Sequence, residues 1–232
     1  MRTLAIVPIK GFDVAKQRLS GSLASGGRRS LAQAMFSDVL GALRRTEGIE
    51  RIAVVTADIG ARALASGDGM VVLEDDACAG QSAACAIGIR YALEQGYERV
   101  LLVPGDTPLL KPPELDDLLA RAERDGLAAA IVPDRHGTGT NGLLIAPPDA
   151  FDPSFGEGSL ERHVAQAGER SLAFRVEALP SLEHDVDTPG DLAALWAVVD
   201  ESRRGAQRTR GALTMLDKAG ARDAVVGAAV EA

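Results

Sequence analysis

Basic and acidic side chains gather in three short segments that lie far apart in this chain. The segments are residues 8–19, 104–108 and 184–189; the first supplies cations, and the other two supply carboxylates. Phosphate groups and their magnesium ions are held by basic side chains together with carboxylate oxygens. If the fold brings the segments together, they could bind and activate a nucleoside triphosphate through Lys10, Lys16, Arg18, Asp106, Asp185 and Asp187.

The composition narrows the class of partner. The chain has 232 residues, of which 46% are hydrophobic, enough to bury the core of one domain. Its net charge of −8 and its aromatic content of 3% argue against a nucleic-acid partner, which would need clustered cations and stacking platforms. Residues 1–30 nevertheless carry six basic residues and one acidic residue, so this segment could attract a small anionic ligand.

The sequence contains no segment typical of a membrane span or a signal peptide. The apolar run over residues 4–9 is interrupted by Pro8 and is too short for either. Cys78 and Cys85 lie seven positions apart, a spacing that fits neither a zinc site nor a redox pair. We therefore expect a cytoplasmic protein with no membrane partner and with both cysteines reduced and buried, while the oligomeric state stays open.

Short apolar runs alternate with segments of helical spacing, which indicates an α/β fold with a mostly parallel sheet. Ser30 and Gln33 could form a capping box, and Thr188 with Pro189 predicts a further helix start. Residues 1–200 would form the domain, and the Arg-rich and Ala-rich residues 201–232 would be a linker and a tail, either disordered or packed as a helix. Strands are expected at 4–7, 52–55, 70–73, 100–103, 129–132, 143–145 and 172–176, and helices at 31–43, 82–93, 114–122 and 160–167.

The expected sheet gives each motif a position. Ligands of such sheets lie beyond the carboxyl ends of the strands, and Lys10 and Asp106 each follow an expected strand. Asp106 also lies in a tight Gly- and Pro-containing exit, where a carboxylate suits a hard cation or, equally, a structural turn. Asp185 and Asp187 are two apart in an extended stretch, so they should point to opposite faces and only one should reach the site.

Two glycine-rich segments match phosphate loops in spacing but not in context. Residues 137–142 fit the dinucleotide pattern, yet a strand is expected after them instead of a helix, and residues 21–27 lack the Lys and Ser/Thr of a P-loop. The turn at residues 155–159 is the better anion site because it precedes a helix with free backbone N–H groups; the alternative is an ordinary Ser159 N-cap. Thr138, Thr140 and Asn141 offer donors in a flexible turn. The three histidines lack metal-site spacing, and we assign them no role.

These motifs, taken as a set over residues 1–200, resemble the guanylyltransferase family of coenzyme F-420 biosynthesis. The matching strings are Val-Pro-Ile-Lys-Gly at 7–11, Ala-Lys-Gln-Arg-Leu at 15–19, Pro-Gly-Asp-Thr-Pro-Leu-Leu at 104–110, Gly-Thr-Asn at 139–141, the turn at 156–159 and Asp-Val-Asp-Thr-Pro at 185–189. The resemblance implies a single-domain nucleotidyltransferase fold of the glycosyltransferase-A type, a mostly parallel mixed sheet flanked by helices. It also implies GTP as co-substrate, magnesium as cofactor, and a three-carbon phosphorylated acid as the second small-molecule substrate.

The resemblance also implies roles for individual residues. Asp106 with Asp185 or Asp187 would hold magnesium, and the basic side chains with Pro8 would face the triphosphate. Residues 80–82 would contact the nucleotide, although the family pattern has a Leu-Asn pair where this chain has Gln81 and Ser82. The three-carbon acid would contact Thr140, Gly156 and Ser159. The nucleotide would contact Gly80, Gln81 and Ser82. The catalytic residues would be Lys10, Lys16, Arg18 and Asp106.

The reaction implied is condensation of GTP with phosphoenolpyruvate to enolpyruvoyl-2-diphospho-5′-guanosine and pyrophosphate. An ionised phosphate oxygen is the nucleophile, so no general base is needed. Other acceptors, 2-phospho-L-lactate and 3-phosphoglycerate, stay open. The rival activities are molybdenum-cofactor guanylyltransferase and sugar-phosphate nucleotidyltransferase, which commonly carry a Gly-rich loop after the first strand, whereas this chain has a single glycine at 11–15. A non-catalytic nucleotide-binding protein is the rival of another class.

Overall fold

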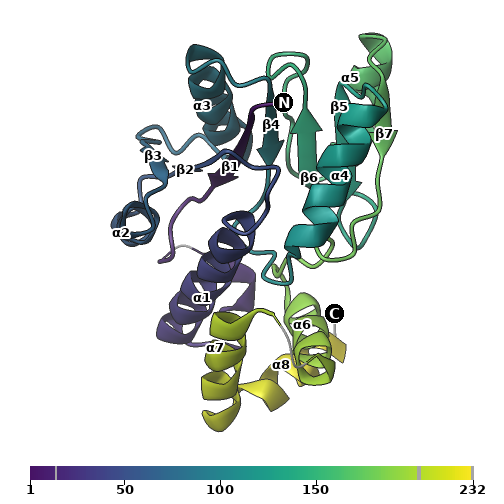
Figure 1. Ribbon diagram of the computed structural model, residues 1–232. Helices are drawn as coiled ribbons and strands as arrows, with labels where there is room; N and C mark the ends of the chain where they lie inside the picture. The colour runs from purple at the N-terminus through teal and green to yellow at the C-terminus, as the bar shows by residue number, and fades with distance from the viewer. Residues whose placement is uncertain (14, 203–204, 231–232) are drawn as a thin grey trace.

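A seven-stranded sheet forms the centre of the computed structural model, which describes residues 1–13, 15–202 and 205–230 (Figure 1). The strand order is β3-β2-β1-β4-β6-β5-β7, and every neighbouring pair is parallel except the two pairs that contain β6. The α/β fold with a mostly parallel mixed sheet is thus confirmed. The strands are β1 Thr3–Pro8, β2 Arg51–Val55, β3 Val71–Leu73, β4 Arg99–Leu102, β5 Ala129–Pro133, β6 Thr140–Ile145 and β7 Phe174–Val176.

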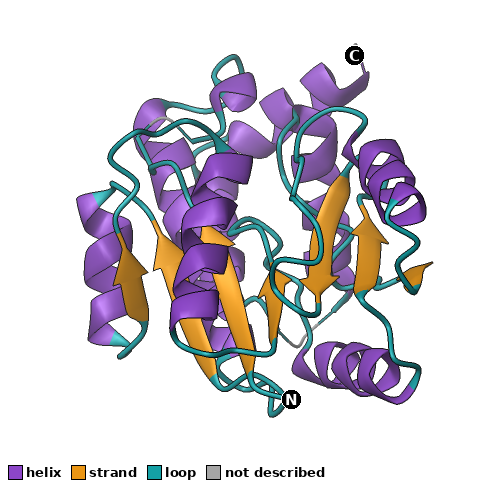
Figure 2. Ribbon diagram, turned by 90° about the horizontal axis from the view of Figure 1, so that it is seen from above, coloured by secondary structure: helices purple, strands orange, loops and turns teal. Residues whose placement is uncertain are grey.

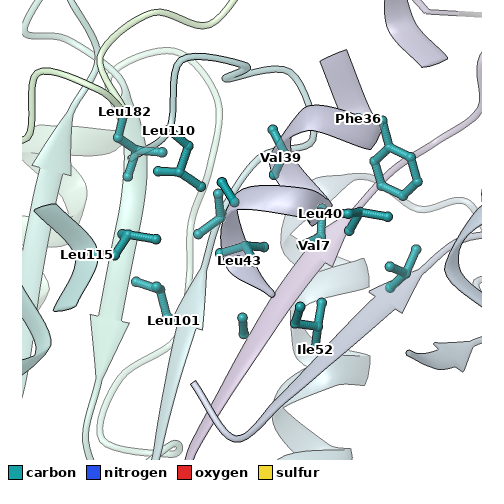
Figure 3. Packing of buried hydrophobic residues seen from close by; sticks show 14 of the residues in the cluster. Val7, Phe36, Val39, Leu40, Leu43, Ile52, Leu101, Leu110, Leu115 and Leu182 are labelled. Atoms are coloured by element: carbon teal, nitrogen blue, oxygen red, sulfur yellow. The ribbon is translucent and has the colours of Figure 1, made fainter. Parts of the chain in front are cut away.

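Helices cover both faces of the sheet (Figures 1 and 2), so the central strands are buried on two sides. Every residue of β1 is buried, which explains why its sequence is a continuous apolar run instead of an alternating one. Val7 and Leu101 face the helices α1 and α4, whose Leu43 and Leu115 pack against them (Figure 3). Ile6, one position earlier, faces the opposite core layer.

All helices predicted within residues 1–200 are present, with longer bounds. The capping box expected at Ser30 is wrong, because α1 begins at Ser25 with Ala24 as its N-cap and Ser30 lies inside the helix. The helix start at Thr188 is confirmed, and Thr188 and Asp191 form a reciprocal capping box there. Two elements were not predicted, α2 Ile59–Gly67 and the short 3-10 helix η1 Gln17–Leu19; the others are α1 Ser25–Leu43, α3 Gln81–Glu94, α4 Pro112–Arg124, α5 Ser159–Glu169 and α6 Pro189–Glu201.

The antiparallel strand β6 brings an extra segment to the carboxyl edge of the sheet. Its first residue, Thr140, pairs with Pro133 at the end of β5, and Asn141 follows inside the strand. Both side chains are buried, so the expectation of a flexible turn is wrong for these two residues. The strand begins at this edge because it runs against its neighbours β4 and β5.

The C-terminal segment, for which disorder or a packed helix was left open, forms two helices in its described part. Helices α7 Gln207–Lys218 and α8 Ala221–Val230 pack against α1 and α6 (Figure 1). Leu213 and Val225 are buried in this contact, and the backbone N–H of Thr209 donates to Asp38 at 2.7 Å. Whether the chain divides into a domain and a tail near residue 200 stays a prediction.

Two smaller expectations concern the cysteines and the membrane. Cys85 is buried and Cys78 is exposed, and both are free, so the expectation of burial holds for only one of them. Cys78 is exposed because it lies in the loop between β3 and α3 instead of in a helix. Across residues 1–13, 15–202 and 205–230, no helix has the length and apolarity to cross a membrane.

Candidate active site

The ammonium group of Lys16 joins the three segments singled out by the sequence. Its Nζ donates to the carboxylate of Asp106 and, at 3.0 Å, to Oδ1 of Asp187. These partners lie 90 and 171 positions away along the chain, in the loops that follow β4 and β7. The side chain of Lys16 is only 6% exposed, so the cation is held in place instead of moving in solvent.

Lys16 is a cation in this environment. Burial alone would lower its pKa, but the charges of Asp106 and Asp187 outweigh burial and raise the pKa to about 12. The residue adopts the left-handed conformation, with φ of 57°, at the start of η1. A non-glycine residue in this region carries strain, which the two carboxylate contacts offset.

Asp185 reaches the same place through Asn141. The Nδ2 group of Asn141 donates to Oδ1 of Asp185 at 3.0 Å and also to the carbonyls of Leu182 and Glu183. Asp185 and Asp187 therefore both approach the site, and the expectation that only one would do so is wrong. The backbone between them is irregular and leads into the α6 cap, so strand alternation does not apply.

The carboxylates of this cluster are not fully compensated by cations. Burial and then the charge of Asp106 raise the pKa of Asp185 to about 6, although the hydrogen bond from Asn141 acts in the opposite direction. A raised carboxyl pKa beside other carboxylates is what a hard cation would reverse, so the donor set fits magnesium. In the described part of the chain, no group of three or more His, Cys, Asp or Glu side chains is arranged to hold a metal ion. Magnesium commonly takes one or two protein carboxylates and completes its shell with water and substrate phosphates.

Two adjoining cavities open at this edge of the sheet, with volumes of about 310 and 530 Å³. The first is lined by Pro8, Lys10, Lys16, Gly80 and Asp106, all of them predicted site residues. The second is lined by the predicted residues Arg18, Gly156 and Ser159. The cavities share five residues, which are Gln81, Thr140, Asn141, Asp185 and Asp187.

One predicted residue lies outside both cavities. The Oγ atom of Ser82 accepts a hydrogen bond from the backbone N–H of Phe155 at 2.9 Å, so Ser82 braces the 154–159 loop from α3. Its neighbour Gln81, the first residue of α3, lines both cavities instead.

The 155–159 turn differs in detail from the ordinary Ser N-cap considered above. Gly158 is the N-cap of α5, in the left-handed conformation, and Ser159 is the first helical residue. The N–H of Ser159 donates to Gly156, and that of Leu160 donates to Thr138, so these two groups are already used. An anion here would have to meet the Ser159 side chain and the remaining first-turn N–H groups.

The buried side chain of His163 connects the two walls of the second cavity. Its Nε2 accepts from the backbone N–H of Ser154 at 2.8 Å, and its Nδ1 lies 2.9 Å from Oγ1 of Thr140. Burial and then the charge of Arg162 lower the pKa of His163 to about 4, so the ring is neutral. Since Ser154 can only donate, the ring proton is on Nδ1 and Thr140 accepts it. The hydroxyl proton of Thr140 is then free to be donated to a ligand.

Three residues near the site were not singled out by the sequence. Asp75 follows β3 at the carboxyl edge, so the positional rule applied to Lys10 and Asp106 could have found it. His163 gave no signal, because a histidine on an amphipathic helix is usually a hydrogen-bonded core residue. Asp191 lies in the first turn of α6, where the sequence indicated only a helix start, but it pairs with Arg135 at 2.5 Å and lines the second cavity.

Comparison with known proteins adds sequence relatives. Residues 3–204 match the family model described as "Guanylyl transferase CofC like". The chain is 51% identical to the phosphoenolpyruvate guanylyltransferase of Conexibacter woesei over 216 residues, which are 93% of this chain and 97% of that protein. It is 33% identical to the 2-phospho-L-lactate guanylyltransferase of Methanothermobacter thermautotrophicus over 195 residues, 84% of each chain.

Solved structures agree on the fold. A nucleotidyl transferase from the same archaeon superimposes with a TM-score of 0.60 and 18% identity, covering 84% of this chain and 95% of that one. At this level of identity the likeness concerns the fold alone.

Proposed function

This chain belongs to the CofC-like guanylyl transferase family, and from that membership we propose that it is a phosphoenolpyruvate guanylyltransferase. The proposal is supported by 51% identity, over nearly the whole chain, to a protein of that name. The observation that carries it is the convergence of Lys16 with Asp106 and Asp187 at the carboxyl edge of the sheet. The product would serve coenzyme F-420 biosynthesis.

The proposed reaction is an in-line transfer at the α-phosphorus of GTP. A phosphate oxygen of phosphoenolpyruvate forms a bond to the α-phosphorus, the bond from this phosphorus to the bridging oxygen breaks, and pyrophosphate leaves with the electron pair. The attacking oxygen is ionised near pH 7, so the site needs no nucleophilic side chain and no general base. The chain's task is to position two anions and to offset their charge.

The basic residues would offset the charge of the triphosphate. Lys10 and Lys16 line the first cavity and Arg18 lines the second, so each cavity has at least one cation in its lining. Lys16 is the best placed to act on developing negative charge, because it is buried, charged and held by two carboxylates. Exposed Lys10 and Arg18 would bind the outer phosphates.

Asp106 together with Asp185 or Asp187 would hold magnesium. A bound magnesium ion supplies charge neutralisation on the phosphate oxygens. The chain's own contribution is to hold Asp106 and Asp187 on the ammonium group of Lys16 and to hold Asp185 on the amide group of Asn141.

The three-carbon acid would lie in the second cavity. Thr140, Gly156 and Ser159 surround this space, and the hydroxyl proton of Thr140 is available to the phosphate or carboxylate of the substrate. The acceptor 2-phospho-L-lactate is the second candidate, because one relative carries that name, but that relative is 33% identical and not 51%.

A pyrophosphate-release assay tests the proposal. The purified protein with GTP and Mg²⁺ is given phosphoenolpyruvate, 2-phospho-L-lactate or 3-phosphoglycerate in parallel. We expect the largest kcat/KM with phosphoenolpyruvate and loss of release when EDTA is added. If no pyrophosphate is released with any of the three acids, and calorimetry shows that the protein still binds GTP, the result would instead support a non-catalytic nucleotide-binding protein.

A further inference from the structure

A buried carboxylate at the far end of the first cavity has no part in the scheme above. Asp75 follows β3, is only 3% exposed and lines the first cavity. Its Oδ1 accepts one hydrogen bond, from the backbone N–H of Cys78 at 3.2 Å. Within the described residues, its other oxygen has no hydrogen-bond partner and no Lys, Arg or His pairs with it. Because Asp75 lines the cavity, this oxygen is available to accept a hydrogen bond from a ligand.

The strand order gives the first cavity a direction. Its lining begins at Asp75 after β3, passes Lys10 after β1 and reaches Asp106 after β4. The buried cation Lys16 and the carboxylates proposed to hold magnesium are at the β4 end. With magnesium bound at the β4 end, Lys16 and the metal ion would favour the triphosphate there, whereas Asp75 offers phosphate groups no cation at the β3 end. The nucleoside, which is uncharged, is left to face Asp75.

The chemistry of a carboxylate then selects among the bases. Guanine presents two adjacent donors, N1–H and the 2-amino group, which match the two oxygens of one carboxylate. Adenine and cytosine present a ring nitrogen acceptor at the corresponding position, and uracil presents one N–H between two carbonyl oxygens. We propose that Asp75 is the residue that reads the base, accepting from N1–H and the 2-amino group of guanine. This inference rests on the proposed function and deepens it.

An exchange of base specificity tests the proposal. The change Asp75→Asn turns one acceptor into an amide donor, which faces the 2-amino group of guanine but complements the 2-carbonyl of xanthine. We expect kcat/KM for GTP to fall about 10- to 100-fold and kcat/KM for xanthosine triphosphate to rise by a similar factor. If Asp75 only supported the loop, the substitution would lower both kcat/KM values together.

Two control variants make the result readable. Asp76→Asn makes the same chemical change at the exposed neighbouring position and should leave both rates unchanged. In Asp75→Ala, kcat/KM for GTP should fall and kcat/KM for xanthosine triphosphate should not rise. A folded Asp75→Asn protein whose preference for GTP over xanthosine triphosphate is unchanged would overturn the inference. The inference would also be overturned if replacing GTP by 2′-deoxy-GTP lowered the activity of the wild-type protein but not that of the Asp75→Asn protein. That result would place Asp75 at the ribose. Wild-type protein inactive with GTP and every acid would contradict the proposed function instead.

Discussion

Charge balance around Lys16 is the central feature of the site at the scale of single residues. One buried ammonium group contacts Asp106 and Asp187, while Asp185 has only the neutral donor Asn141. The arrangement is thus short of positive charge, and burial increases the cost of that shortage. A divalent cation brought by the triphosphate would supply what is lacking.

The raised pKa of Asp185 predicts a specific dependence of stability on pH. The ordinary pKa is 3.8 and the folded-state pKa is about 6. Between these values the folded state holds a proton that the unfolded chain has lost, so the contribution of Asp185 to stability falls as pH rises. The change Asp185→Asn mimics the protonated form. In urea unfolding without magnesium, we expect the variant to match wild type near pH 4 and to exceed it by on the order of 2 kcal/mol at pH 7. A difference that is the same at both pH values would contradict this account.

His163 is predicted to act through Thr140. The change His163→Leu removes the donor that orients the Thr140 hydroxyl, whereas His163→Asn keeps a donor near the position of Nδ1. One neutral hydrogen bond is worth roughly 1 kcal/mol, so KM for the three-carbon acid should rise about five- to tenfold in His163→Leu. KM for GTP should not change, and His163→Asn should recover part of the loss. Equal changes in both KM values would mean that His163 only supports the fold.

At the scale of elements, the close approach of α3 to β1 positions the first cavity. A Cβ atom on Gly88 would lie 2.5 Å from Cγ2 of Ile6, so only glycine allows this distance. Gln81, at the start of the same helix, lines both cavities. Displacing α3 would therefore alter the nucleotide site as well as the core.

The change Gly88→Ala is expected to destabilise the protein by about 1–3 kcal/mol through overpacking, although alanine favours helices. The matched control is Gly168→Ala in α5, where a Cβ would meet nothing within 4 Å and where a gain of up to about 1 kcal/mol is expected. Thermal or urea unfolding of the two variants gives the comparison. Equal stability of both would show that α3 can shift away from β1 without cost.

The helices and strands also show which parts of the fold the sequence pattern could predict. Apolar runs located all seven strands, most clearly in the central strands such as β1, which are buried on both faces and therefore apolar without alternation. Boundaries were less accurate where polar residues belong to an element. Helix α1 starts at Ser25, five residues before the Ser30 that fitted a cap, and β6 includes the polar Thr140 and Asn141. Helix α2 was missed because its apolar face contains small residues, Ala61 and Ala65.

At the scale of the whole molecule, topology unites residues that the chain keeps far apart. The rule that ligands lie beyond the carboxyl ends of strands predicted the edge on which Lys10 and Asp106 stand. It could not predict the approach of Asp185 together with Asp187, because both lie in a loop whose path depends on Asn141 and the α6 cap. The contact of His163 with Thr140 likewise arises only from packing of α5 on the sheet. The catalytic and binding roles of these residues stay predictions.

The most direct test of the central claim is the turnover of Asp106→Asn with GTP, phosphoenolpyruvate and Mg²⁺. The exposed Asp149→Asn protein serves as the control. If Lys16, Asp106 and Asp187 form the phosphate and metal site, the Asp106 variant should fold as wild type does and lose kcat by at least about 100-fold. The control should keep full activity. A folded Asp106→Asn protein with unchanged kcat and unchanged magnesium dependence would contradict the claim.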